Sequence, residues 1–291
     1  MRTANALTLR VAGVVLRAAV SLAAAPSLVA FAWQPPALAE AASGKTFATR
    51  EDAVAALIDA LRRDDGRALR AVLGPDSDKL VNSGDHTADL AMRRKVLAAY
   101  DEKHELVADG PDRAVLTVGP DAWPLPLPLV QAGGRWRFDT QLGIEQLVDR
   151  RIGRNEIAAI RTALAYVDAQ KLFFEMMQKD GHAEYARQLV STPGKQDGLY
   201  WPAGTDEPQS PLAPLVAQAT EEGYPGARVG GRRMPYHGYY VRILTAQGAS
   251  APGGAMDYLA DGRMTKGFGL VAWPARFGIS GVMTFIVSQD G

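Results

Sequence analysis

The sequence predicts an α+β fold with two lobes. Apolar side chains at helical spacing precede short strand-like runs twice, first up to residue 138 and again after residue 141. Helices followed by a meander of antiparallel strands are typical of a sheet that packs on helices. We therefore expect an N-terminal helix-plus-sheet lobe at residues 40–150. A C-terminal lobe at residues 151–291 would consist of a long helix, a Pro/Gly-rich loop and an antiparallel sheet.

The first 39 residues are typical of an export leader. Three arginines are their only charges: Arg2, Arg10 and Arg17. An uncharged stretch rich in Ala, Leu and Val follows and ends in Ala37-Leu38-Ala39, which is a small-residue cleavage site. An uncleaved anchor helix is the alternative, but Pro26 and Pro35-Pro36 interrupt the span of about 20 apolar residues that it needs. We expect a signal peptide at residues 1–39, cleavage after Ala39, and a periplasmic protein without a membrane span in the mature chain.

The composition excludes several kinds of site. The chain has no Cys, 4 His, and 32 Lys and Arg against 32 Asp and Glu. It therefore lacks thiolate metal ligands and a Cys nucleophile, and it lacks the basic field on which nucleic-acid binding depends. The spacings of a serine nucleophile elbow and of the two glycine-rich nucleotide-binding loops are absent, and His104 has no second His four residues on. We expect no cofactor, no metal site and no nucleic-acid partner.

The N-terminal lobe is expected to hold three helices and four strands. Thr49 stands in the capping position of the first helix, because its hydroxyl can accept from the amide of Asp52. This helix ends near Gly66, and two more are expected through Leu69–Leu73 and over about Thr87–Tyr100. The predicted strands are His104–Val107, Ala114–Val118, Leu125–Gln131 and Trp136–Phe138, with a tight hairpin at Gly133-Gly134.

A long helix opens the C-terminal lobe. Its pattern starts at Gln141 and is interrupted at Gly143 and Gly153. Its buried face is predicted from an apolar stripe: Ile157, Ile160, Leu164 and Val167. One more short turn of helix is expected at His182–Leu189.

The remaining residues are expected to form an irregular segment and a sheet. Between Ser191 and Pro235 six prolines leave only residues 212–222 for a helix. The predicted strands are Tyr236–Leu244, Met256–Ala260, Phe268–Trp273 and Val282–Ser288, with a hairpin turn at Asp261-Gly262. Alternation along the first strand puts His237, Tyr239, Val241 and Ile243 on one face and Tyr240, Arg242 and Leu244 on the other.

Both lobes resemble known architectures in their order of elements. Helices before an antiparallel meander resemble the cone-shaped nuclear-transport-factor-2-like fold. A long helix before a meander resembles the soluble heads of type IV pilins, although the mature N-terminus lacks the long hydrophobic pilin helix. These likenesses concern architecture and carry no function.

A set of local motifs resembles one family more specifically. The motifs are Phe47–Val54, Tyr100–His104, Gly134–Thr140, Ile152–Glu156, Ala165–Gln170, Tyr236–Tyr240, Ala251–Ala255 and Leu270–Pro274. In this order they are similar to the bacterial exported family of unknown function DUF2950, from about Phe47 to Gly291. The resemblance implies an exported protein and no particular activity.

The aromatic residues of the last sheet are the candidates for a ligand or partner site. They are Tyr236, His237, Tyr239, Arg242, Asp257, Tyr258 and Trp273. Rings supply contact area and a few polar groups fix orientation. The alternative is that Tyr239 and its neighbours are core and that His237 is a hydrogen-bonded edge residue.

Three functions remain compatible with these observations. The first is an exported, non-catalytic protein that binds another component of the cell envelope. The second is a carrier with a small-molecule cavity in the N-terminal lobe. The third is a periplasmic hydrolase that uses His237 or a carboxylate.

Overall fold

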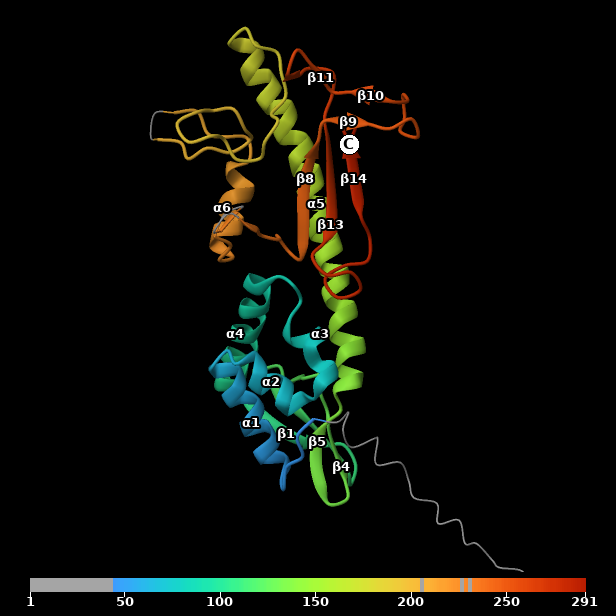
Figure 1. Ribbon diagram of the computed structural model, residues 1–291. Helices are drawn as coiled ribbons and strands as arrows, with labels where there is room; N and C mark the ends of the chain where they lie inside the picture. Colours follow the sequence, from blue (N-terminus) through green and yellow to red (C-terminus); the bar gives the residue numbers. More distant parts are fainter. Residues whose placement is uncertain (1–43, 205–206, 226–227, 230–231) are drawn as a thin grey trace, which may run out of the picture. The chain divides into compact units, whose positions relative to one another are not determined.

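The computed structural model describes residues 44–204, 207–225, 228–229 and 232–291 (Figure 1). The leader and its expected cleavage site after Ala39 lie outside these residues. The described chain belongs to one compact unit. Its helices and small antiparallel sheets confirm the predicted α+β class. None of the helices within these ranges is long and apolar enough to cross a membrane.

Residues 44–138 build the first hydrophobic core. The helices are α1 (Arg50–Arg62), α2 (Gly66–Leu73), α3 (Asp78–Val81) and α4 (His86–Glu102), with a 3-10 turn η2 (Pro75–Ser77). The strands are β1 (His104–Ala108), β2 (Arg113–Val118), β3 (Trp123–Pro124), β4 (Leu129–Ala132) and β5 (Arg135–Phe138). They form one antiparallel sheet in the order β1-β2-β4-β5, with β3 paired to β2. Leu57, Leu116 and Leu129 are buried where the helices meet this sheet.

The local signals in this half are confirmed. The Thr49 side chain accepts a hydrogen bond from the amide of Asp52 at 3.0 Å, as a helix cap does. Gly133 and Gly134 have φ values of 57° and 75°, which a tight hairpin of the primed type requires. Ala132 and Arg135 are paired across that turn.

Helix α5 (Thr140–Lys179) runs without a break for 40 residues, so the predicted interruptions at Gly143 and Gly153 are wrong. A side chain at Gly143 would meet Leu127 and would approach the carbonyl oxygen of Pro126 to 2.8 Å. Glycine at this position therefore lets the helix lie close to the segment Pro126-Leu127, and the helix continues through it. The lobe boundary predicted near residue 150 falls inside this helix, and the division into lobes stays a prediction.

The predicted buried face of this helix is also wrong. Ile157, Ile160 and Leu164 are 53%, 44% and 50% exposed, and of the stripe only Val167 is buried. The buried face carries alanines, aromatic residues and a Gln instead: Ala159, Ala163, Tyr166, Gln170 and Phe173. The buried face is therefore set by the contacts that these residues make and not by the aliphatic stripe.

The predicted turn of helix at His182–Leu189 is absent from the described chain, which is irregular there. Its backbone groups bond to distant partners. The amide and the carbonyl of Ala186 bond to the side chain of Gln170 at 2.8 Å, and the amide of Tyr185 donates to Met264 O at 2.7 Å. These tertiary bonds replace the helical ones.

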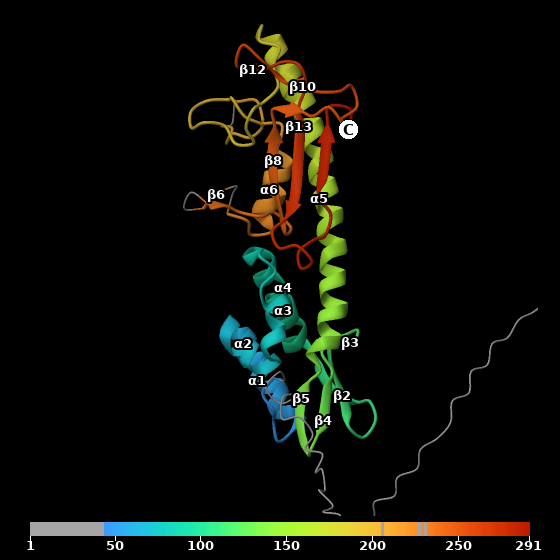
Figure 2. The ribbon, with the colours of Figure 1, turned by 45° about the vertical axis from the view of Figure 1, so that its right-hand side comes forward.

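The C-terminal half holds one more helix and several small sheets. They are α6 (Ala213–Glu221), β6 (Arg228–Val229), β7 (Arg232–Arg233), β8 (Tyr239–Leu244), β9 (Ala246–Gln247), β10 (Met256–Asp257), β11 (Leu259–Ala260), β12 (Arg263–Met264), β13 (Gly269–Pro274) and β14 (Phe285–Ser288). The largest of these sheets has the antiparallel order β14-β13-β8, and α5 runs alongside its strands (Figure 2). The predicted turn at Asp261-Gly262 is confirmed, with φ values of 51° and 75°.

Helix α5 touches both halves of the chain. Near its start, the guanidinium of Arg151 donates to the carbonyl oxygens of Lys79 and Leu80 at 2.7 and 3.1 Å. One turn later, Asn155 donates to Ser280 O at 2.8 Å. Helix α5 therefore contacts both α3 and the loop that precedes β14.

Candidate functional site

The structure places the seven predicted site residues in three different surroundings. Tyr236 and His237 belong to a tight turn before β8, and Arg242 and Trp273 lie on one face of the β14-β13-β8 sheet. The other three support the fold: Tyr239, Asp257 and Tyr258. A role of all seven in one binding site stays a prediction.

The turn at Tyr236–Tyr239 is built from two left-handed residues. His237 and Gly238 have φ values of 45° and 74°, and the amide of each flanking tyrosine donates to the carbonyl of the other at 2.8 and 3.0 Å. A side chain at position 238 would also collide with the side-chain Nδ2 atom of Asn155. The strand therefore starts at Tyr239 rather than at the predicted Tyr236. His237 is not part of the strand, so it does not share a strand face with Tyr239.

A buried carboxylate holds this turn. Asp85 is 1% exposed, and its Oδ2 accepts from the amide of Gly238 at 2.8 Å and from the hydroxyl of Tyr224 at 2.9 Å. Its Oδ1 accepts from the amide of Ala88 at 3.0 Å as the cap of α4, where the helix dipole favours negative charge. The Tyr224 hydroxyl in turn accepts from the amide of His237 at 3.1 Å. Burial, and then the charge of Asp85, raise the pKa of Tyr224 above its ordinary value.

A second carboxylate pairs with the histidine of the turn. The Nε2 atom of His237 lies 2.9 Å from Oε2 of Glu222, and both side chains are about one-third exposed. The ring of Tyr236 lies 4.2 Å from that of His237. Burial, and then the charge of Glu222, raise the pKa of Tyr236 to about 12.

A histidine beside a carboxylate has the geometry of a general base. The tyrosine hydroxyls near His237 are those of Tyr224 and Tyr236, and their raised pKa values keep both protonated at neutral pH. This opposes the phenolate that a tyrosine nucleophile needs. Within the described ranges, no three His, Asp or Glu side chains converge as a metal-ligand set.

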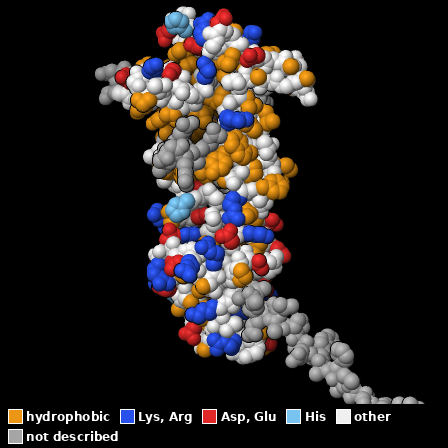
Figure 3. All heavy atoms as spheres, in the orientation of Figure 1, with side chains coloured by type: hydrophobic (Ala, Val, Ile, Leu, Met, Phe, Trp, Pro, Cys, Tyr) orange, Lys and Arg blue, Asp and Glu red, His pale blue; other side chains and the backbone are white. Residues whose placement is uncertain are grey.

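One face of the three-stranded sheet is partly exposed, and we call it the outer sheet face. It is formed by Tyr240, Arg242, Val271, Trp273 and Ile286. Trp273 pairs with Tyr240, and Val271 pairs with Arg242 on one side and with Ile286 on the other. The Tyr240 and Trp273 rings lie 5.8 Å apart, and Ile286 is 72% exposed. Hydrophobic side chains gather over these strands in the space-filling view (Figure 3).

The opposite face of the sheet is core. Tyr239 is 1% exposed, and its hydroxyl donates to Met283 O at 3.0 Å. Tyr258 is 2% exposed, and its hydroxyl donates to Oε1 of Gln247 at 2.8 Å. Asp257 accepts from the amide of Leu259 at 2.9 Å and stabilises a turn. These three predicted residues therefore have structural partners.

With this geometry in hand, the comparisons with known proteins add one finding. The model of the family described as protein of unknown function (DUF2950) matches residues 44–291. The chain belongs to this family. No curated protein and no solved structure matches the chain. The turn, the buried carboxylate and the outer sheet face all lie inside the DUF2950 match.

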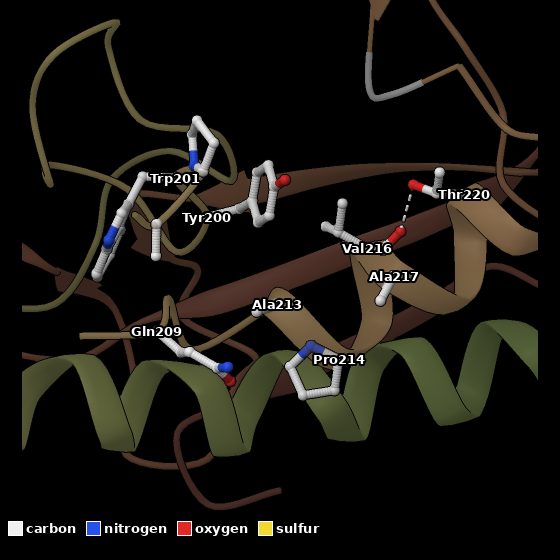
Figure 4. Close-up of a pocket in the computed structure, with 10 residues that line it drawn as sticks. Tyr200, Trp201, Gln209, Ala213, Pro214, Val216, Ala217 and Thr220 are labelled. Atoms are coloured by element: carbon white, nitrogen blue, oxygen red, sulfur yellow. Dashed lines mark hydrogen bonds between the residues drawn. The ribbon is translucent and has the colours of Figure 1, made fainter. Parts of the chain in front are cut away.

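This DUF2950 chain also has a groove that the sequence did not predict. Its volume is about 610 Å³, and the segment Tyr200–Ala203 faces α6 across it (Figure 4). Trp201 is fixed by a hydrogen bond from its Nε1 to Pro208 O at 3.2 Å. A smaller hollow of about 210 Å³ lies between α5 and the other side of α6. Tyr200 and Trp201 in the Pro-rich segment are the residues from which a sequence reading could have suspected it.

Asp85, Tyr224 and Glu222 are the polar residues that sequence reasoning missed. Asp85 and Tyr224 are 139 positions apart in the chain. The one local signal was at Asp85 itself, because an Asp directly before a helix is a typical cap.

Proposed function

We propose that this DUF2950 protein is exported and binds another polypeptide of the cell envelope on its outer sheet face, without catalysis. The carrying observation is the composition of that face. Aromatic residues and Arg are enriched at the centres of protein interfaces, where they bury large area with few rotatable bonds. Tyr240, Arg242 and Trp273 supply these residue types on neighbouring strands.

The exposed apolar area supports binding rather than a solvent-facing role. Ile286 at 72% exposure is a large apolar side chain that the fold leaves outside. Burial of a full aliphatic side chain is worth about 1.5–3 kcal/mol. Large contiguous apolar patches on a protein surface mark interaction sites, and Ile286 stands beside the partly exposed Val271 of the same face.

The sequence of the leader supports export. Its test is the intact mass of the protein recovered from the periplasmic fraction of its own host. We expect a chain that begins at Glu40. Full-length material with Met1, recovered from the cell interior, would contradict export.

Binding can be tested by site-specific photo-crosslinking in the native host. A photoreactive amino acid replaces Ile286, and the same replacement at Met92 on α4, which is 45% exposed, is the matched control. We expect a cross-linked product of one discrete mass from position 286 and none from position 92. The product should disappear when Arg242→Glu is added. A lack of product, or the same product from both positions, would refute binding on this face.

The groove favours a second candidate function, which is a small-ligand carrier. Its volume of about 610 Å³ falls within the range of small-molecule sites, and rings of Tyr200 and Trp201 line it. It lies in the C-terminal half, whereas the carrier hypothesis from the sequence placed the cavity in the N-terminal lobe. Native mass spectrometry of host-purified protein should show a retained ligand that Ala217→Trp removes. Protein of unchanged apo mass in both cases would exclude a tightly bound ligand.

A further inference from the structure

Strand β14 forms an open edge of the sheet. It pairs with β13 on one side, and the described residues place no strand on its other side. Its residues are Phe285, Ile286, Val287 and Ser288, without a charge, a Pro or a Gly. Natural proteins usually protect an edge with charges, prolines or bulges, because the free N–H and C=O groups of an edge strand can pair with another chain.

On its β14 side, α5 carries an exposed apolar ridge that consists of Ile160 and Leu164. Glu156, Ile160 and Leu164 are spaced by four residues and therefore lie along one face of the helix. The Glu156 carboxylate accepts from the amides of Val282 and Met283 at 2.9 and 3.0 Å, in the segment that leads into β14. This contact places the ridge on the β14 side of the helix.

The other side of α5 faces α6. Ala165, Ala169 and Leu172 line the hollow between α5 and α6, on the flank away from the ridge. Ile160 and Leu164, 44% and 50% exposed, are therefore directed to the side where a further strand beyond β14 would lie.

We propose that β14 accepts an extended apolar segment of a partner polypeptide as a fourth strand, with the side chains of that segment packed on Ile160 and Leu164. This rests on the proposed binding function and names its mode. Side chains on one face of a strand repeat about every 6.6 Å, and residues four apart on a helix repeat about every 6 Å. Two successive inward side chains of the added strand therefore match Ile160 and Leu164.

A bare segment fits this edge better than a second copy of the chain. Paired strands lie about 4.8 Å apart, whereas packed helices need about 8–10 Å. Helix α5 contacts β14 more extensively than it contacts β13. Symmetric pairing of two β14 strands would therefore bring the two α5 helices too close together.

The turn after β14 allows a direct test. The amide of Gly291 donates to Ser288 O at 3.2 Å, and Gly291 has a φ of 91°. Such a turn with a left-handed Gly is typical of the loop of an antiparallel hairpin. A strand added after Gly291 can therefore be expected to run back along β14.

The experiment uses the full chain extended after Gly291 by Val-Thr-Val-Thr-Val-Lys or by Thr-Val-Thr-Val-Thr-Lys. The two extensions differ by one residue in register, so one of them directs its valines at α5 and the other directs them away. An extension with Pro at alternate positions is the control, because Pro cannot donate to the ladder. The readouts are hydrogen exchange at Phe285–Ser288 and thiol labelling of Ile160→Cys, which is a unique site because the chain has no Cys.

We expect one register to slow exchange at β14 and labelling at position 160 by about tenfold or more relative to the Pro control. Leu164→Cys repeats the labelling test should Ile160→Cys disturb folding. Equal rates with all three extensions would overturn the proposal. It would also be overturned if labelling of the unextended protein slowed with protein concentration as a dimer formed, because the occupant would then be a second copy.

The natural partner is tested by competition. A photoreactive amino acid at Ile160 should give a cross-linked product in the host, and the protecting extension should abolish it while the Pro extension should not. Arg242→Glu should leave the extension's protection of β14 unchanged. If position 286 gives no cross-linked product in the protein with Arg242 intact while the extension still protects β14, the outer-face function alone is refuted. If the extension gives no protection, strand addition alone is refuted.

Discussion

Replacement of Tyr224 by Phe tests whether the Asp85 cluster holds the two halves of the chain together. The substitution removes one hydrogen bond to a buried carboxylate and leaves the amide of His237 without its acceptor. A hydrogen bond to a charged group contributes about 1.5–3 kcal/mol, and an unsatisfied buried donor costs about 1 kcal/mol more. Asp85 is 1% exposed, so solvent screening reduces these values little. We expect a loss of about 2.5–4 kcal/mol in the free energy of unfolding.

The assay is urea unfolding of four proteins: wild type, Tyr224→Phe, Asp85→Asn and the double variant. The two side chains share one hydrogen bond, so the losses should be non-additive, with a coupling energy of about 1.5–3 kcal/mol. Tyr236→Phe is the matched control, because it removes a hydroxyl from the same cluster without breaking a hydrogen bond, and its effect should stay within about 0.5 kcal/mol. Additivity within about 0.5 kcal/mol would refute the assignment of Asp85 as the centre of this cluster.

Three further predictions follow from backbone geometry, burial and titration. In unfolding experiments, Gly238→Ala should destabilise the fold by about 3 kcal/mol, because the new side chain would meet its neighbours in a left-handed turn. Gly134→Ala is the control: it has open space around it and should cost only about 1–2 kcal/mol. Stability should fall as pH rises above about 10, because tyrosines ionise there in the unfolded chain but Tyr236 keeps its proton up to a pKa of about 12 in the fold. A urea midpoint that stays flat from pH 9 to 12 would contradict this. Ile157→Ser should change the thermal midpoint little, whereas Val167→Ser should cost about 2 kcal/mol or more, and equal losses would show that the exposed stripe is packed.

Signals confined to a few residues were predicted correctly from the sequence. The cap at Thr49 and the hairpins at Gly133-Gly134 and Asp261-Gly262 depend on the conformations that neighbouring residues allow. Such preferences act whatever the rest of the chain does. The α+β class followed from the same local periods.

The long helix shows where a pattern is insufficient. Periodicity identified α5 but assigned its buried face by side-chain size, so Ile157 and Ile160 were expected inside. The buried face contains Gln170, whose amide group bonds to Tyr166 and to both backbone groups of Ala186. A buried Gln is stable only with such partners, and they come from a segment that no helical period can predict.

The strand assignment of Tyr236 and His237 was wrong for a reason of register. Tyr236 and His237 were assigned to the same strand as Tyr239, and strict alternation would then put His237 in the Tyr239 row. His237 and Gly238 are two successive left-handed residues and form a hairpin turn. The pleated strand therefore begins only after them. Alternation is valid only from Tyr239 onward, where it correctly separates the inward Tyr239 from the exposed Arg242. The face opposite Tyr239 therefore carries the exposed Arg242 of the predicted site. Tyr240, which the sequence placed on that face without selecting it, lies beside the ring of Trp273 there.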